Sequence, residues 1–434
     1  MLTACRTSPA VDGGVDGGPD AGHDASASDG GRDAAIDGGS DGGAMDSGSG
    51  NPGWIFVQGL PEGCRFEVAR DPSAALPPLR FEPCRGRSGC RRAVVDWPWS
   101  PGSEARLGRH ESSTSDGAHA YFTWVRSVQS TGRWWWYYTI ARDDGQPRFV
   151  LRKPTEPEVE GTCTIRQLAI TPRSFATAVT TFGGDYENQS FPLRGRFDDP
   201  EGWATVTARP SIDDLIQDVY TSDTTTALDS AGRTYRYGPD GAIEQLSVGP
   251  TSTIDAVDGD LILASVFANP EGWRGVVFQP GETTAGTIVP ASAEGEAGML
   301  RPDGDELSFF RLIEPITVTR YTRAELWVSA TDGDRQPLAP RFLSRLPVPG
   351  VQRSVAHRFG RVQVGQALDV IGIYDTTTGE RREYRSPPER ATGGHSILAA
   401  EEIGVGVAFL QVSRGLETIE FVRYDSLPVV PVPE

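Results

Sequence analysis

Histidines and activated serines, on which most acid–base and nucleophilic catalysis depends, are scarce in this chain of 434 residues. A serine nucleophile would need a Gly-x-Ser-x-Gly turn leading from a strand into a helix, and no such strand–turn–helix is present. Beyond the N-terminal segment the histidines are His110, His119, His357 and His395. His395 stands in the Gly-rich run 392–396 and is the best placed for catalysis or ligand binding. We favour the alternative, an ordinary solvated loop histidine.

Carboxylates are plentiful and gather in three short segments. These segments contain Asp185 and Glu187, then Asp198, Asp199 and Glu201, then Asp213 and Asp214. A glycosidase needs two carboxyl groups about 5–10 Å apart across a cleft, and sequence spacing does not show whether residues from different segments meet. Each cluster lies in a loop-like stretch, where solvated charge is the usual state. The sequence therefore identifies no catalytic residue.

One stretch is strongly aromatic. Trp134, Trp136 and Tyr138 would share one face of a strand and Trp135 and Tyr137 the other, because side chains alternate along a strand. We favour packing inside the fold for at least one set. The other set could form a platform on which sugar rings or peptide aromatics stack.

The cysteines predict disulfide bonds. Apart from Cys5 there are four, Cys64, Cys84, Cys90 and Cys163. An even number in a chain that crosses a membrane favours two disulfides, for which three connectivities exist. We favour Cys84 with Cys90 and Cys64 with Cys163. A zinc site is the rival, but no Cys-x-x-Cys is present and the histidines lie too far off for a standard spacing, so we expect no metal and no cofactor.

The chain opens with a lipidation signal. Leu2-Thr3-Ala4-Cys5 resembles the lipobox at which bacterial signal peptidase cleaves before a cysteine that then receives lipid. The charged and apolar segments that precede a lipobox in a signal peptide are missing, and we interpret this as a start codon placed too late. The alternative is a cytoplasmic protein with a coincidental cysteine. On the first reading, the protein is anchored to a membrane through lipid on Cys5.

Residues 6–52 have the composition of a disordered tether. From residue 8 onward they are almost wholly Asp, Gly, Ala and Ser, which cannot bury enough apolar surface to fold. A Gly-rich segment of roughly 45 residues has a root-mean-square span of about 35–40 Å, enough to hold a domain clear of a bilayer. The Asp-Gly repeats also suggest calcium, but the defined ligand positions of a calcium loop are missing.

The charge excludes one class of partner. The net charge is −18, and residues 1–52 carry nine Asp against Arg6 and Arg32, which leaves a mild acidity over the rest of the chain. A nucleic-acid or anionic-membrane surface needs clustered Lys and Arg, so we expect no nucleic-acid partner. Lys153 is the single lysine, and the high Arg, Pro and Gly contents are typical of a GC-rich bacterial genome.

From residue 116 onward the chain repeats one pattern of strands and turns. Asp116-Gly117 precedes apolar runs at 120–125, 134–140 and 148–151. The turn that closes such a unit recurs at Gly145, Gly232, Gly281, Gly333, Gly379 and Ser426, with a hidden turn near Asn188. A spacing of about 47 residues fits one four-stranded blade of a β-propeller. We predict an all-β chain with a single propeller of seven blades, with six or eight left open.

The strands themselves support this prediction. Continuous apolar runs at 261–267 and 370–374 fit strands that are covered on both faces, as they are when blades stack. Residues 212–219 have helical spacing and predict either a short helix or an inner strand with poor alternation. The propeller would occupy residues 53–434. Within it, residues 53–115 form a disulfide-pinned first blade or cap, or supply the strand that closes the ring against Phe421–Tyr424.

The central unit resembles a known repeat. Arg301–Phe309, followed by Glu325–Val328 and Thr331–Gly333, resembles the WD40-like repeats of the bacterial TolB family, and residues 115–145 resemble it more loosely. The matching positions are Asp-Gly turns and apolar strands, which are structural. The resemblance implies a docking role in the cell envelope. It supplies no functional residues, because the repeat also occurs in peptidases and lyases whose chemistry lies elsewhere.

Together these patterns predict a cell-envelope lipoprotein, most simply of the outer membrane. It would act as a binding or scaffold module through the loop face or the central channel of its propeller. Its ligand would be a protein or a glycan. The alternative is an envelope enzyme, a lyase or hydrolase of polysaccharide, which would need carboxylates or a histidine that converge at the channel.

Overall fold

The structure is a computed structural model, and the residues it describes belong to one compact unit within Ser49–Glu434. The described residues are 53–61, 63–94, 105–130, 133–155, 162–182, 188–205, 210–230, 232–248, 252–268, 271–290, 296–317, 320–347, 355–365, 370–385, 394–400, 404–411 and 416–432. Cys5, the tether 6–52, Asp185 and Glu187 lie outside them. Side chains are not described for His110, Trp134 or His395.

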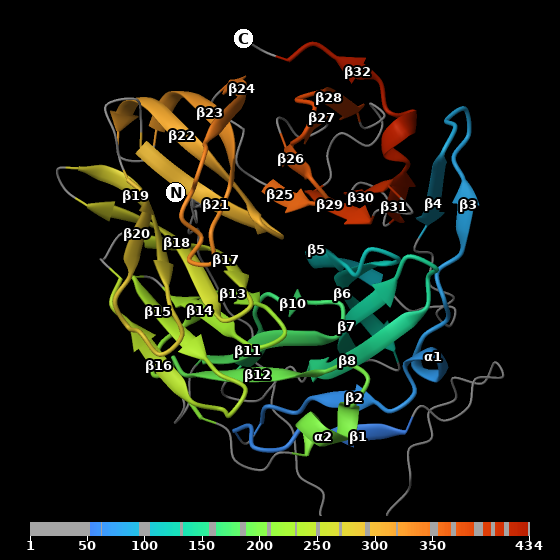
Figure 1. Cartoon of the computed structure of the whole chain (residues 1–434). Helices are drawn as coiled ribbons and strands as arrows, with labels where there is room; N and C mark the ends of the chain where they lie inside the picture. The colour runs from blue at the N-terminus through green and yellow to red at the C-terminus, as the bar shows by residue number, and fades with distance from the viewer. Residues whose placement is uncertain are drawn as a thin grey trace, which may run out of the picture. The chain divides into compact units, whose positions relative to one another are not determined.

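Seven antiparallel sheets follow one another along the chain, and each is one blade of a β-propeller (Figure 1). Blade 1 contains β5 (Ala105–Ser115), β6 (Ala120–Ser130), β7 (Arg133–Arg142) and β8 (Pro147–Thr155). Blade 2 contains β9 (Thr162–Ile165), β10 (Ala169–Ile170), β11 (Ser174–Phe182) and β12 (Ser190–Arg196). Blade 3 contains β13 (Ile216–Thr221), β14 (Thr226–Ser230), β15 (Arg233–Tyr237) and β16 (Ile243–Leu246).

The second half of the chain continues in the same way. Blade 4 contains β17 (Ser252–Asp258), β18 (Leu261–Ala268), β19 (Gly272–Phe278) and β20 (Gly286–Val289). Blade 5 contains β21 (Glu296–Asp303), β22 (Glu306–Thr317), β23 (Arg320–Ala330) and β24 (Arg341–Pro347). Blade 6 contains β25 (Val355–Arg358), β26 (Arg361–Gly365), β27 (Val370–Asp375) and β28 (Arg381–Arg385), and blade 7 contains β29 (Gly394–Ala400), β30 (Gly404–Gln411) and β31 (Leu416–Val422).

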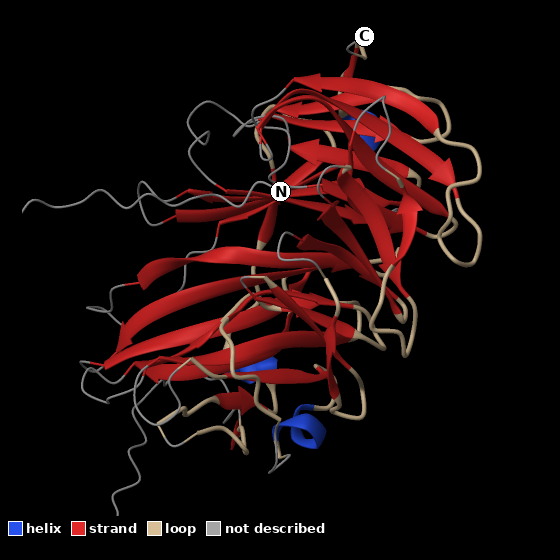
Figure 2. Ribbon diagram, turned by 90° about the vertical axis from the view of Figure 1, so that its left-hand side faces the viewer, coloured by secondary structure: helices blue, strands red, loops and turns tan. Residues whose placement is uncertain are grey.

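The first strands of the blades form the innermost ring, and in blade 2 this strand is interrupted, so that β9 and β10 both pair with β11. In chain order β10 contacts β13, β13 contacts β17, β17 contacts β21, β21 contacts β25 and β25 contacts β29. β29 and β10 both contact β5, which completes the circle. The prediction of an all-β propeller with seven blades is thus confirmed. Figure 2 shows how little helix the described residues contain: α1 (Pro72–Ala75), α2 (Pro200–Ala204) and the 3-10 turn η4 (Tyr424–Ser426).

The apolar core lies between neighbouring blades. In β18, Ile262 packs in a cluster with Ala227 of blade 3. The next residue, Leu263, points the other way and packs with Leu300 and Phe309 of blade 5. Successive side chains of a strand face opposite sides, so a strand between two blades must be apolar at every position. This is why the run 261–267 does not alternate.

Residues from both ends of the chain extend existing blades. β4 (Cys90–Val94) pairs antiparallel with β31, with Arg91 opposite Phe421, and β3 (Phe81–Pro83) pairs with β4. β1 (Trp54–Phe56) and β2 (Glu67–Ala69) extend blade 1 beyond β8, and β32 (Val429–Val430) extends blade 6 beyond β28. Within residues 53–115, β3 and β4 complete blade 7 and close the ring, which is one of the roles that the sequence allowed, whereas β5 is the first strand of blade 1 and β1 and β2 join its outer edge.

Two disulfides hold this N-terminal segment. Cys64, in the loop between β1 and β2, is bonded to Cys163 in β9 of blade 2. Cys84 is bonded to Cys90 across the turn between β3 and β4. These are the two pairs favoured above.

Three of the predicted closing turns do not close a blade. Asn188 lies between β11 and β12, the second and third strands of blade 2, and Ser426 lies in η4 after β31, whose outer neighbour β4 comes from the N-terminal segment. Gly232 does not close a blade, because it lies in the turn between the second and third strands of blade 3, and Gly241 occupies the closing turn.

Of the two alternatives predicted for residues 212–219, the inner strand with poor alternation is the one found, and there is no helix. Ile212 forms an isolated bridge with Ser190, and the strand β13 begins at Ile216. Among the described residues, no helix has the length and apolarity needed to span a bilayer.

Candidate functional site

Polar residues link successive blades along the turns between their first and second strands. All first strands run in the same direction, so these turns lie on one face of the propeller, here named the first-turn face. Ser174 of blade 2 donates a hydrogen bond of 3.1 Å to Asp223 of blade 3. Ser222 of blade 3 donates to the carbonyl of Gly259 in blade 4 over 2.6 Å. Most polar side chains of this face are thus engaged in joining blades.

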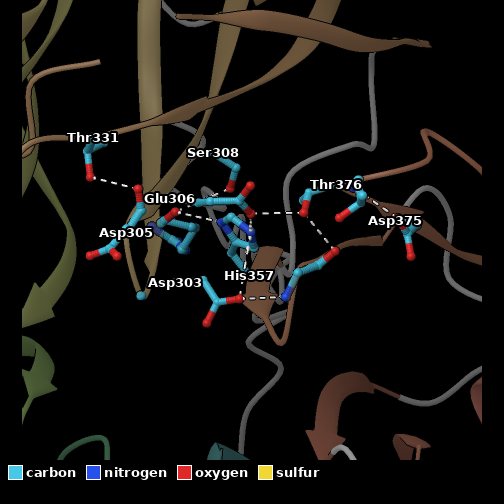
Figure 3. Close-up of polar contacts among 12 residues, drawn as sticks. Asp303, Asp305, Glu306, Ser308, Thr331, His357, Asp375 and Thr376 are labelled. Carbon is cyan, nitrogen blue, oxygen red and sulfur yellow. Dashed lines mark hydrogen bonds and ion pairs between the residues drawn. The ribbon is translucent and has the colours of Figure 1, made fainter. Parts of the chain in front are cut away.

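One junction on this face holds a histidine. His357, in β25 of blade 6, faces Asp303 and Glu306 of blade 5 (Figure 3). Its Nε2 atom lies 3.4 Å from Glu306 Oε2 and 3.8 Å from Asp303 Oδ2, and its side chain is 0% exposed. We name Asp303, Glu306 and His357 the blade 5–6 cluster. Neighbouring groups hold both carboxylates: the Gly360 amide donates to Asp303 over 2.8 Å, and the Thr376 hydroxyl lies 2.9 Å from Glu306 Oε2.

The other ring nitrogen decides the tautomer of His357. Nδ1 lies 3.2 Å from the carbonyl oxygen of Arg301. A carbonyl can only accept, so Nδ1 carries the hydrogen, and in the neutral ring Nε2 is a lone-pair acceptor. Burial lowers the pKa of His357, while Asp303 and Glu306 act in the opposite direction. Among the described residues Nε2 has no hydrogen-bond partner, and it faces two carboxylates.

A second polar group lies along the inner strands of blades 3 to 5. Asp218 in β13 is directly opposite Asp229 in β14. The pKa of Asp229 is raised to about 7, chiefly by burial and also by the Asp218 charge, against a hydrogen bond from Thr234 that lowers it. We name Asp218 and Asp229 the blade 3 pair. A carboxyl group with a raised pKa beside a second carboxyl group can take part in acid–base chemistry, and such a pair can also hold a cationic group.

Asp255 and Arg301 extend this inner group. Asp255 in β17 is buried, which raises its pKa, and Arg301 of blade 5 lies 4.0 Å from its carboxylate. Arg301 also donates to the carbonyl of Val355 in blade 6 over 3.1 Å. The buried phenol of Tyr220 has a raised pKa, because of burial first and then of Asp218. The inner strands of blades 4, 5 and 6 are thus linked through Arg301.

The remaining histidine with a described side chain belongs to the ring closure. His119 Nδ1 lies 3.0 Å from Asp143, and Arg91 of β4 donates to the same carboxylate over 2.9 Å. Asp143 is almost fully buried. This group therefore ties blade 1 to the closing strand and presents no free catalytic histidine.

The carboxylates singled out from the sequence that the structure describes mostly form hydrogen bonds and ion pairs with nearby residues. Asp198 pairs with Arg196 at 2.7 Å, and Asp199 accepts from the Gly202 amide at the start of α2. Asp214 accepts a hydrogen bond of 2.6 Å from Ser230, whereas Asp213 is exposed. Among the described residues these contacts are separate for the 198–201 and 213–214 segments, and Asp185 and Glu187 lie outside the described residues.

The aromatic stretch also packs within the fold. Tyr137 and Tyr138 are buried on opposite faces of β7, in two different core clusters. Trp136 packs partly buried against the first cluster and Trp135 against the second. The guanidinium of Arg152 lies 4.6 Å from the centre of the Trp135 ring, so this residue too has a structural contact.

Sequence reasoning did not single out the residues of the two clusters described here. His357 was one of four histidines, and its partners lie more than 50 positions away in another blade. The pairing of Asp218 with Asp229 depends on a register shift between Ile216 and Asp218. One signal in the sequence was available. His357 stands two residues before the Phe359-Gly360 turn, and Arg301 stands two residues before the Asp303-Gly304 turn, so both occupy equivalent positions in successive blades.

A pocket of about 280 Å³ lies at a different place, beside α1. Its walls include Asp71, Ser73, Gln146, Arg148 and Phe197. Polar side chains and one aromatic ring make it a plausible contact surface. It contains no pair of carboxylates with perturbed pKa values that would indicate acid–base chemistry.

Comparisons with known proteins concern the fold alone. No family model matches the chain, and no curated protein does. Among solved structures, BamB from Moraxella catarrhalis is 14% identical, with 85% of this chain and 100% of that chain covered and a TM-score of 0.41. The β-propeller domain of the Trilobed protease from Pyrococcus furiosus is 13% identical, with 73% and 94% covered and a TM-score of 0.43. Hsv2 from Kluyveromyces lactis is 11% identical, with 76% and 99% covered and a TM-score of 0.44.

Proposed function

We propose that this chain is a lipid-anchored protein of the bacterial cell envelope and that its propeller works as a binding or scaffold module. The anchor would be lipid on Cys5, and residues 6–52 would be the tether. The propeller would then be held at a distance from the membrane and would present its loops and channel to a protein or a glycan. A rigid scaffold that positions loops is a common basis for binding sites.

The observation that carries this proposal is the pairing of all four cysteines in the described residues. Cys64 is bonded to Cys163 and Cys84 to Cys90. Disulfides persist in oxidising compartments such as the periplasm and the cell surface, and they are rare in the cytosol. This supports export of the chain and weighs against the reading in which Cys5 is a coincidence.

The way in which the ring closes supports a rigid binding module. Strands from the N-terminal segment extend blades 1 and 7, and β32 extends blade 6. Both ends of the described chain are therefore held by sheet pairing. A module closed in this way is pre-organised, which lowers the entropy cost of binding a partner.

The anchor can be tested by lipid labelling. The reading frame, expressed in a bacterial host together with the genomic segment before Met1, would be labelled with an alkyne fatty acid. We expect label in the wild type and none in Cys5→Ser. Cys84→Ser with Cys90→Ser serves as the matched control, because it changes cysteines without touching the anchor. An unlabelled wild type, or label that survives Cys5→Ser, would overturn the proposed anchor.

One observation favours a second function, an enzyme that acts on envelope polysaccharide. In the blade 3 pair, Asp229 has a pKa of about 7 beside the exposed Asp218. A general acid works best when its pKa lies near the operating pH. The test of this second function is the last of the predictions below.

A further inference from the structure

The pocket beside α1 combines one cation, one anion and two neutral polar side chains with apolar residues. Its volume is about 280 Å³. Pockets for drug-sized ligands occupy about 300–1,000 Å³, so this one has room for a single ring with its substituents. Asp71, Ser73, Gln146 and Arg148 are exposed on its walls, whereas Phe197 is a buried ring of the core. Such a mixture is typical of sites that bind small polar molecules.

The pocket exists because β2 covers only part of β8. β2 pairs with β8 at Leu151 and Arg152 alone, and the earlier residues of β8 lie beside α1 instead. The walls of the pocket therefore come from the N-terminal segment, from blade 1 and, through Phe197, from the end of blade 2. The Cys64–Cys163 disulfide ties the N-terminal segment to blade 2, so these walls are held together.

Arg148 supplies a cation that the fold does not use. Its guanidinium forms no hydrogen bond and no ion pair with the described residues, and the same is true of the side-chain amide of Gln146. The pKa of Asp198 is lowered first by a hydrogen bond from Arg196 and more weakly by the Arg148 charge, so Asp198 is already engaged elsewhere. A guanidinium presents a planar fork of N–H groups that matches a carboxylate. Arg148 is therefore available for the carboxylate of a ligand.

Asp71 supplies an acceptor whose orientation is fixed. Its Oδ1 atom accepts hydrogen bonds from the amides of Ser73 and Ala74, over 3.0 and 3.1 Å, and from the Ser73 hydroxyl. These bonds, the one from the Ser73 side chain first, lower the pKa of Asp71 and keep it ionised. Its second oxygen, Oδ2, accepts no hydrogen bond from the described residues. A hydroxyl group is a donor that suits such an oxygen.

We propose that this pocket binds one acidic sugar residue, a uronic acid, of an envelope polysaccharide. The sugar carboxylate would accept from Arg148, and the hydroxyls would donate to Asp71 and exchange hydrogen bonds with Gln146. The apolar face of the ring would lie against Phe197. One positive and one negative side chain leave the pocket without net charge, which favours a singly charged ligand over a phosphate dianion. The proposal rests on the binding function proposed above and names its glycan, but it does not depend on the lipid anchor.

The experiment is a calorimetric titration of the full chain with galacturonic acid and with three probes that each lack one feature. Galactose lacks the carboxylate, acetate lacks the ring, and alanylalanine carries an ammonium group and a carboxylate without a ring. A ligand of one ring has roughly a dozen non-hydrogen atoms, which limits it to about millimolar affinity. We expect galacturonic acid to bind in this range and each probe to bind at least about tenfold more weakly. A probe that binds as tightly as galacturonic acid would overturn the proposal, and alanylalanine would then indicate a peptide ligand.

Two arginine variants locate the binding. Arg148→Gln should weaken galacturonic acid at least about tenfold, because a charge-assisted hydrogen bond is lost, and should leave galactose unchanged. Arg341→Gln is the matched control, because Arg341 is an exposed arginine of β24 that also forms no hydrogen bond or ion pair with the described residues. An unchanged urea midpoint in both variants shows that they fold. Equal affinity in the wild type and Arg148→Gln, or a wild type that does not bind galacturonic acid, would overturn the proposal.

A glycan array with the same variants separates this proposal from the binding function itself. If the wild type and Arg148→Gln retain the same acidic glycan equally, the propeller is a binding module but this pocket is not its site. If the array and envelope extracts yield no ligand while galacturonic acid still binds in a way that depends on Arg148, the pocket assignment stands and the wider binding function fails.

Discussion

Arg87 lies over the ring of Tyr384, with its guanidinium carbon 5.3 Å from the ring centroid, although 297 positions separate the two residues. Tyr384 in β28 donates a hydrogen bond of 2.7 Å to Glu420 in β31, and Arg87 lies 3.4 Å from the same carboxylate. Arg87 is at the tip of the loop that the Cys84–Cys90 disulfide closes. The N-terminal segment therefore inserts a cation where blades 6 and 7 meet.

The first prediction concerns this contact. Arg87→Ala should lower the free energy of unfolding by about 1–3 kcal/mol, because it leaves the buried Glu420 carboxylate without its cation. This expected loss of unfolding free energy is smaller than for a fully buried ion pair, because about a third of the Arg87 side chain is exposed. Urea unfolding followed by tryptophan fluorescence measures the change. The matched control is Arg85→Ala, because Arg85 is an exposed arginine of the same loop, and this variant should change the free energy of unfolding by less than about 0.5 kcal/mol. An equal loss in both variants would show that the contact of Arg87 with Tyr384 and Glu420 does not stabilise the fold.

The second prediction compares the two disulfides. Cys64 and Cys163 are 99 residues apart and Cys84 and Cys90 are 6 apart. A crosslink removes more entropy from the unfolded chain when it closes a longer loop. Replacing both cysteines by serine should cost about 4–5 kcal/mol for the first pair and about 2 kcal/mol for the second. Urea midpoints and slopes of the two double variants decide this, and a reversed order would show that strain or local packing outweighs loop entropy.

The pattern of apolar residues explains why the architecture could be predicted. Runs such as 261–267 are apolar on both faces, apart from Ser265, because blades cover both faces of the strand. The ring closure was harder to predict, because the pairing of Arg91 with Phe421 joins opposite ends of the chain and leaves no local signature. Gly232 was taken for a closing turn because glycine occurs in the second turn of a blade as well as in the third.

The two polar clusters were beyond sequence reasoning for a related reason. Asp303 and His357 come from separate blades, and neither segment shows by itself that the other is near. The blade 3 pair depends on a bulge next to Ile216, which shifts the register by one residue and sets Asp218 opposite Asp229. A one-residue shift reverses which side chains share a face. Patterns within one strand cannot reveal it.

The third prediction follows from the pKa of Asp229. This pKa is raised from 3.8 to about 7, so the folded state holds a proton that the unfolded chain has already released. The stability from that proton is complete below about pH 4 and is lost as the pH rises through about 7. Relative to Asp229→Asn, the wild type should therefore lose up to about 4 kcal/mol of unfolding free energy between pH 4 and pH 8.

Urea unfolding at several pH values measures that difference. Asp213→Asn is the matched control, because it removes an exposed aspartate that lies just before the first strand of the same blade. Asp218→Asn should move the midpoint of the effect to lower pH, since it removes a charge that raises the pKa of Asp229. A wild-type curve parallel to that of Asp229→Asn at every pH would show that Asp229 has an ordinary pKa.

The fourth prediction separates binding from catalysis. If the propeller is a binding module, the full chain should retain a ligand on a glycan array or capture an envelope protein, and it should release no new reducing ends or unsaturated products from envelope polysaccharides. A catalytic blade 3 pair would behave differently, because an acid and a base act as a unit. Asp218→Asn and Asp229→Asn would then each abolish product release by a factor of at least about 100, while Asp213→Asn would leave it unchanged. If the wild type turns over polysaccharide and both variants of the blade 3 pair lose this turnover, the enzymatic function replaces the binding function. If the wild type binds a ligand without turnover and Asp229→Asn binds it equally well, the ligand is bound by the loops.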